Sequence, residues 1–166
     1  MHCRLFGIVL LLAAVGTASA QDKVSSKWSL LTAYEVNYTG NNAVLHAVYK
    51  PSKKQTIEVG LNYNFSDGFA ANPVVGMGIS YGYSVLQTAS WEATIGVDYR
   101  RQKPIAIVNI QTITYTTKVA YTINQRWSAF TRIGYGLAAE RARSAGPFTQ
   151  SNNITGSLSL GCVFHL

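Results

Sequence analysis

Residues 55–65 read QTIEVGLNYNF, and a large apolar side chain occupies every second position of this stretch. The apolar positions are Ile57, Val59, Leu61, Tyr63 and Phe65, and the residues between them are Thr56, Glu58, Gly60, Asn62 and Asn64. Successive side chains of a β-strand point to opposite faces of the sheet. The alternation therefore predicts a strand with one apolar face and one face of small and polar residues.

The same alternation recurs along most of the chain. Residues 74–84 and 90–100 follow it strictly, and five further segments follow it less strictly: 28–38, 43–50, 110–123, 127–140 and 154–166. Residues 105–123 are compatible with one long strand or with a strand preceded by a structured loop. Eight strands of about ten residues, separated by short polar connections, predict an all-β fold, an eight-stranded antiparallel up-and-down transmembrane β-barrel.

The composition helps to distinguish a membrane barrel from a soluble one. Charged residues make up 13% of the chain, whereas about 25% is typical of soluble domains. A secreted soluble barrel, the alternative, needs an outer face rich in Lys, Glu and Asp. Here the polar face is mostly Gly, Ser, Thr and Asn. The apolar face is large and aromatic, as a lipid-facing wall requires.

Aromatic residues cluster at the predicted strand ends. Trp28, Trp91 and Trp127 each open an odd-numbered strand, and Phe164 closes an even one, so all four lie at one end of an up-and-down barrel. Tyr38, Tyr99 and Tyr135 mark the other end. The β-propensity of aromatics explains their number but not this placement. Two aromatic girdles are typical of a barrel that spans a bilayer.

The first twenty residues have the pattern of a secretory signal. A short basic start that includes Arg4 precedes an apolar stretch, and small residues ending at Ala20 resemble a cleavage site. We therefore expect a cleaved signal peptide at residues 1–20 and a barrel domain at residues 21–166. The apolar stretch is short for a membrane anchor. Cys162 would be the one cysteine left, so no intramolecular disulfide is expected.

The chain resembles the small eight-stranded outer-membrane barrels of Gram-negative bacteria, of the outer membrane protein X and outer membrane protein A type. The resemblance covers residues 27–166 and is most specific in the last strand, with Ile154, Leu158, Leu160, Cys162, Phe164 and Leu166 on one face. That face resembles the signal read by the outer-membrane assembly machinery, although this family usually ends in Phe rather than Leu. The resemblance implies a monomer in the bacterial outer membrane, with connections 66–73, 101–109 and 141–153 outside.

With that topology, the outward connections carry a basic rim. Its residues are Arg100, Arg101, Lys103, Arg141 and Arg143, with Asp67 as the one acidic residue in these connections. A basic rim suits the phosphates of outer-membrane lipid, including lipopolysaccharide. Simple solvation and a specific polyanionic ligand are the alternatives. The chain has a net charge of +7, yet it has no nucleic-acid recognition motif, so nucleic acid is not an expected partner.

The polar face carries charges that a barrel would enclose. They form a predicted lumen cluster of Glu35, His46, Glu58, Glu92, Asp98, Lys118 and Arg132. An eight-stranded barrel is only just wide enough for side chains to fill, so we expect a plugged polar lumen and no open pore. The turn at residues 124–126 places Lys118 beside Arg132, with Glu92 and Asp98 as the nearest candidate counter-ions.

The sequence offers little for catalysis. A hairpin turn at Gly40-Asn41 would set Glu35 opposite His46, but this pair lacks a nucleophile. His165 lies at the periplasmic end, far from an outer-leaflet substrate. We therefore expect no catalytic residue, cofactor or metal, and a structural or surface-interaction role. The alternative function is that of a lipid A modifying enzyme, either a deacylase or an acyltransferase.

Overall fold

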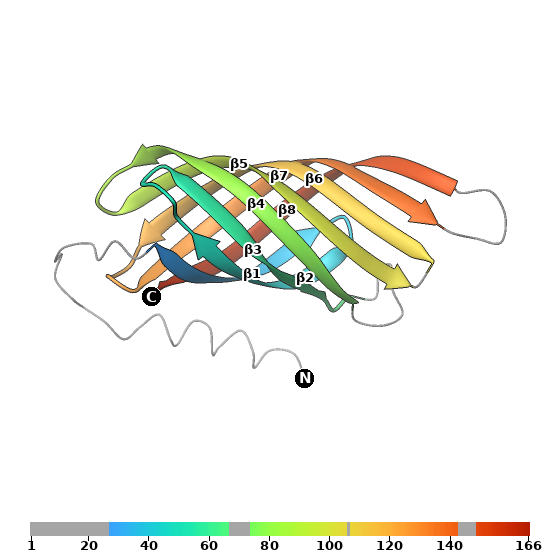
Figure 1. Cartoon of the computed structure of the whole chain (residues 1–166), viewed down its shortest axis with the longest axis horizontal. Helices are drawn as coiled ribbons and strands as arrows, with labels where there is room; N and C mark the ends of the chain where they lie inside the picture. Colours follow the sequence, from blue (N-terminus) through green and yellow to red (C-terminus); the bar gives the residue numbers. More distant parts are fainter. Residues whose placement is uncertain (1–26, 67–73, 106, 143–148) are drawn as a thin grey trace.

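The computed structural model describes residues 27–66, 74–105, 107–142 and 149–166 (Figure 1). The predicted signal peptide, Asp67 and Arg143 lie outside these residues. Among the described residues, no helix is long and apolar enough to cross a membrane.

Eight antiparallel strands form a closed barrel, which confirms the predicted fold. Their bounds are β1 Trp28–Asn37, β2 Gly40–Tyr49, β3 Gln55–Asn64, β4 Val74–Gln87, β5 Trp91–Ile105, β6 Val108–Thr122, β7 Trp127–Ala142 and β8 Thr149–His165. Each strand pairs with the next along the chain, and β8 closes the barrel by pairing with β1. Closure leaves few unpaired backbone groups, as a bilayer requires.

The strands are unequal in length. β1, β2 and β3 have 10 residues each, whereas β7 and β8 have 16 and 17. In Figure 1 the β7–β8 hairpin reaches well beyond the β1–β2 hairpin at the end opposite the C-terminus. We call the end that contains Trp28 and Phe164 the tryptophan end, and the other the opposite end.

The connection expected at residues 101–109 is not a loop. β5 continues to Ile105 and β6 begins at Val108, with an irregularity in register between Gln102 and Ile105. Of the two alternatives for residues 105–123, a single strand is correct for Val108–Thr122. Alternation continues along β5 as far as Lys103, so Arg101 to Lys103, expected in a solvated loop, occupy defined faces of the barrel.

The first hairpin turns earlier than Gly40-Asn41. Gly40 has φ +101° and already pairs with Asn37, so the turn is formed by Tyr38 and Thr39. The backbone N–H and the hydroxyl of Thr39 both donate to Asn37 Oδ1, at 2.8 and 2.7 Å. An Asn side chain that bonds to the backbone two residues later stabilises a tight turn, and a positive φ favours glycine at the next position.

The two faces of each strand meet the environments that the alternation predicts. On β3, Val59 and Leu61 are 51% and 50% exposed on the outside, whereas Glu58 and Asn62 are buried inside. One part of the interior differs from the expected polar lumen. Near the tryptophan end it holds a cluster of apolar side chains: Leu31, Ala33, Val44, Val48, Phe130 and Val163.

Candidate functional site

The charged side chains inside the barrel form its most distinctive site. The seven residues of the predicted lumen cluster all face inward, but they do not form one cluster. Six of them fall into three ion-pair groups, two of which include one further residue: the Glu58 group (Glu58, Lys118 and Arg132), the Arg100 group (Glu35 and Asp98, with Arg100) and the Lys50 pair (Glu92, with Lys50). The seventh, His46, lies beside the Glu58 group.

The Glu58 group joins opposite walls of the barrel. Lys118 and Arg132 are direct register partners on β6 and β7, as the turn at residues 124–126 predicts. Lys118 Nζ donates to Glu58 Oε1 at 2.6 Å, and Arg132 Nη2 donates to Glu58 Oε2. The predicted counter-ions Glu92 and Asp98 form no ion pair with Lys118 or Arg132, although the Glu92 carboxylate still attracts Lys118 electrostatically. They lie on the neighbouring strand β5, where the register sets Thr94, not a carboxylate, beside Lys118.

Phe130 separates the Glu58 group from the apolar cluster. The Phe130 ring centroid lies 5.9 Å from Lys118 Nζ and 5.6 Å from Arg132 Cζ. A cation within about 6 Å of an aromatic face is attracted by the ring quadrupole. Phe130 is 5% exposed and packs with the apolar cluster, so the charged layer rests directly on an apolar layer.

His46 is fully buried beside this group. Its Nδ1 lies 3.7 Å from Glu58 Oε2, and its Nε2 lies 3.3 Å from Asn62 Oδ1. The expected pairing with Glu35 is wrong, because the earlier turn sets Glu35 opposite Asn42 and His46 opposite Leu31. The shift is by an even number of residues, so both side chains still face inward.

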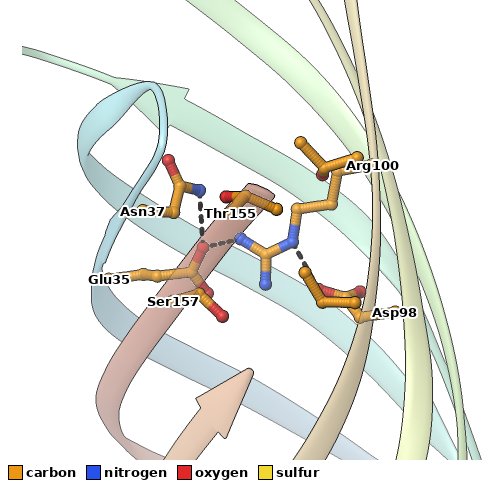
Figure 2. A pocket seen from close by; sticks show the side chains of 8 residues that line it. Glu35, Asn37, Asp98, Arg100, Thr155 and Ser157 are labelled. Carbon is orange, nitrogen blue, oxygen red and sulfur yellow. Dashed lines mark hydrogen bonds and ion pairs between the residues drawn. The ribbon is translucent and has the colours of Figure 1, made fainter. Parts of the chain in front are cut away.

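The Arg100 group corrects the predicted basic rim, because Arg100 lies inside the barrel and is 5% exposed (Figure 2). Arg100 Nη1 donates to Glu35 Oε1, and Arg100 Nε donates to Asp98 Oδ2 at 2.6 Å. The hydroxyl of Ser159 completes the bonding of Glu35 at 2.7 Å. Because β5 continues past residue 100, the alternation that turns Asp98 inward turns Arg100 inward too.

A small polar cavity, with room for about one water molecule, adjoins this group. Its lining, shown in part in Figure 2, consists of Glu35, Asn37, Asp98, Arg100, Thr112, Thr114, Thr155 and Ser157. Arg100 Nη2 is buried and has no hydrogen-bond partner among the described residues. A cavity of this size is too small for an organic ligand.

The Lys50 pair lies closer to the tryptophan end. Lys50 Nζ donates to Glu92 Oε2 at 2.7 Å and to Oε1 at 3.0 Å, and the Ser84 hydroxyl also donates to this carboxylate. Sequence reasoning placed Glu92 in the lumen but missed Lys50, which directly follows β2. The alternation could not identify it, because a Lys at a strand end has the same pattern whether it faces inward or extends into water.

Tyr38, predicted as a girdle residue, lies in the turn between β1 and β2 at the opposite end and bonds to the projecting strands β7 and β8. Its hydroxyl donates to Glu140 Oε1 at 2.9 Å and accepts a hydrogen bond from Asn153 Nδ2 at 2.8 Å. Tyr38 belongs to the short β1–β2 hairpin, and its partners lie on the adjacent wall, where β8 and β7 follow β1 around the barrel. Desolvation and the neighbouring Glu140 carboxylate raise the pKa of Tyr38, which keeps its hydroxyl a donor.

The other predicted girdle residues lie on or beside the lipid-facing wall. At the tryptophan end each Trp contacts the aromatic residue directly opposite it: Trp28 with Tyr49, Trp91 with Tyr121 and Trp127 with Phe164, at centroid distances of 4.7, 4.8 and 4.8 Å. Toward the opposite end, Tyr135 is 63% exposed, and Tyr99 is half-buried on the same outer face.

Sequence reasoning missed one contact between hydroxyls and a histidine. Ser29 Oγ lies 3.0 Å from His165 Nδ1, and Ser128 Oγ lies 2.9 Å from His165 Nε2. Both serines are 5% exposed, so neither hydroxyl is open to an ester group. No local signal predicts this contact, because barrel closure brings together residues 136 positions apart. The contact joins β1, β8 and β7 at the tryptophan end.

The other residues of the predicted basic rim that the structure describes are exposed. Arg101, Lys103 and Arg141 lie on the outer face near the opposite end. Among the described residues, no group of three or more His, Cys, Asp or Glu side chains is arranged to hold a metal ion.

Comparisons with known proteins agree with this architecture. The chain resembles a de novo designed protein, TMB2.3, with a TM-score of 0.56 and 10% identity over 85% of this chain and 94% of the other. It also resembles the outer membrane protein AlkL in DMPC bilayers, with a TM-score of 0.53 and 12% identity over 90% and 94% of the two chains. At these identities the likeness concerns the fold alone.

No curated protein matches the sequence. A family model does match: the outer membrane protein beta-barrel domain, over residues 8–166. The match spans nearly the whole chain and agrees with a closed barrel that has an apolar exterior and aromatic residues at its ends. The chain belongs to the outer membrane protein β-barrel family, and its location is the bacterial outer membrane.

Proposed function

We propose that this protein is a closed, non-conducting barrel with a structural or surface-interaction role in the outer membrane. The observation that carries the proposal is the stacking of ion pairs across the lumen on an apolar layer. The Glu58 group ties β3 to β6 and β7, the Arg100 group ties β5 to β1, and the Lys50 pair ties β2 to β5.

This arrangement opposes ion flow in two ways. Moving one partner of a buried ion pair leaves the other uncompensated, which costs about 3 to 5 kcal/mol. Toward the tryptophan end, the apolar cluster around Phe130 and Leu31 lines the interior on the side of β1, β2, β7 and β8, where it offers no polar group to a hydrated ion. Tyr38 adds hydrogen bonds to β7 and β8 at the opposite end.

Planar bilayer recording tests the closed lumen. We expect no sustained single-channel current from the purified protein. A porin, which has an aqueous channel, measured in the same membranes is the positive control. Sustained current at the scale of that porin would contradict the proposal.

The enzyme alternative is tested separately by mass spectrometry of lipid A from cells that express the protein. We expect an unchanged spectrum, because the two histidines of the barrel are already bonded inside it: His46 to Asn62, and His165 to Ser29 and Ser128. A gain or loss of an acyl chain that disappears in a His165→Ala or His46→Ala variant would favour the enzyme.

The orientation of the barrel also belongs to this proposal. Outer-membrane barrels have short turns on the periplasmic side. The connections at the tryptophan end are short, and the long strands β5 to β8 project at the opposite end (Figure 1). We therefore place the tryptophan end at the periplasm and the opposite end at the cell surface.

A further inference from the structure

Charge is segregated between the inside and the outside of the barrel. Every Asp and Glu in the described part of the chain faces the lumen: Glu35, Glu58, Glu92, Asp98 and Glu140. The exposed charged residues described are all basic: Lys27, Lys53, Lys54 and Arg126 at the tryptophan end, and Arg101, Lys103 and Arg141 at the opposite end. The described outer surface therefore has a single sign of charge.

Two of these cations are brought together by register. Asn109 on β6 is the direct partner of Arg141 on β7, and it accepts a hydrogen bond from Arg101 Nε on β5 at 3.0 Å. The strand β6 lies between Arg101 and Arg141, and the hydrogen bond to Asn109 holds the Arg101 guanidinium against β6, on the side of Arg141. We call Arg101, Lys103, Asn109 and Arg141 the outer arginine cluster. No carboxylate lies within ion-pair distance of Arg101 or Arg141 among the described residues.

The outer arginine cluster lies where the apolar surface ends. One register row across β5 to β8 consists of Tyr99, Ile113, Leu137 and Ile154, and the last three are 53%, 62% and 67% exposed. The next outward-facing row consists of Arg101, Gln111, Ala139 and Asn152. Two residues along a strand span about 7 Å, so the wall changes from apolar to cationic within the thickness of a lipid headgroup region.

We propose that the outer arginine cluster binds a phosphate group of an outer-leaflet glycolipid, with Arg101 and Arg141 as its two main ligands. A guanidinium presents a planar fork of donors that matches phosphate oxygens. The acyl chains of such a lipid would lie against Ile113, Leu137 and Ile154 directly below. This inference rests on the proposed surface-interaction role and on the orientation given above.

The cations of the tryptophan end provide a matched control. Lys53 and Lys54 are equally exposed, but they lie in a turn between β2 and β3, and each is a single point charge. General attraction to an anionic surface is similar for any Lys or Arg near it. A selective loss on removing Arg101 and Arg141 therefore separates a specific site from general attraction.

The test uses the purified full-length barrel in detergent, with native mass spectrometry to count bound lipid. The probes are diphosphoryl lipid A and the same lipid after removal of its phosphates. We expect the parent protein to bind diphosphoryl lipid A at least about tenfold more tightly, the effect of one strong charge-assisted contact. The R101Q/R141Q variant should lose this preference, and the K53Q/K54Q variant should keep it.

Three results would overturn the inference. They are equal binding of the two lipids by the parent protein, an undiminished preference in R101Q/R141Q, and an equal loss in K53Q/K54Q. A competition arm distinguishes the source of the phosphate: displacement of lipid A by an equal concentration of inorganic phosphate would also overturn the lipid assignment. An unchanged urea midpoint for R101Q/R141Q shows that the variant is folded.

The bilayer recording keeps this inference separate from the proposed function. If the protein carries no current and binds both forms of lipid A equally, the phosphate site alone is overturned. A conducting barrel with the lipid preference would overturn the closed lumen and leave the phosphate site supported.

Discussion

Lys118 Nζ on β6 lies 2.6 Å from Glu58 Oε1 on β3, and the ion pair spans the lumen between residues 60 positions apart. Arg132 shares the same carboxylate from β7. One buried carboxylate thus holds two adjacent cations that would otherwise repel each other. The pairing explains how an interior this narrow accommodates long charged side chains.

Arg132→Ala should destabilise the barrel by about 1 to 3 kcal/mol, because the buried Glu58 Oε2 loses its charge-assisted donor while Lys118 keeps its own bond to Oε1. Reversible urea unfolding from lipid vesicles measures the change. The matched control is Arg126→Ala, which removes an exposed cation from the β6–β7 turn and should change stability by less than about 0.5 kcal/mol. An unchanged midpoint for Arg132→Ala would rule out the Glu58 group as a stabilising element.

Gly60→Ala should be strongly destabilising. A Cβ at this position would lie 2.1 Å from Leu45 O and 2.6 Å from His46 Cα, both of which are backbone atoms. The neighbouring strand would have to move, which costs more than a side-chain rearrangement. Gly156→Ala is the control, because its Cβ would lie 3.7 Å from Gly134 O, an ordinary contact distance. The two variants are compared by their urea midpoints, and equal midpoints would contradict this account.

Substitution to Arg should show which face of β3 meets lipid. Leu61→Arg should cost about 2 to 4 kcal/mol if Leu61 lies near the bilayer midplane, whereas Trp91→Arg near an interface should cost about 0 to 1 kcal/mol in charge placement. Asn62 is fully buried in the lumen, so Asn62→Arg should also destabilise by overpacking. Unfolding from lipid vesicles ranks the three variants. If Asn62→Arg leaves the free energy of unfolding unchanged, and Leu61→Arg and Trp91→Arg lower it equally, the inner and outer faces of the barrel are reversed.

Tyr38→Phe should loosen the β1–β2 hairpin at the opposite end. The change removes the hydrogen bonds to Glu140 and from Asn153, each worth about 1 kcal/mol. Hydrogen exchange of the β1–β2 hairpin amides should increase, because Tyr38 ties that hairpin to β7 and β8. Tyr135→Phe is the control on the lipid-facing wall, where Tyr135 is 63% exposed. Equal exchange in both variants would argue against a role of Tyr38 in holding that hairpin.

The sequence by itself determined the number of strands, the two faces of each strand and the contact between Lys118 and Arg132. These features are local. Alternation has a period of two residues and needs no partner to be read, and the β6–β7 connection is short enough to set its own register. The same reasoning located the inward positions of Glu35, His46 and Glu58 even though the first turn was misplaced, because the shift was even.

Only the tertiary structure decided which inward residues meet. Glu58 rather than Glu92 or Asp98 neutralises Lys118 and Arg132, and Arg100 joins Glu35 from the facing wall. These pairs join strands that are not neighbours, so no turn length or alternation specifies them. Closure of the barrel, its circumference and its stagger set which side chains face each other across the lumen. That geometry is a property of all eight strands together.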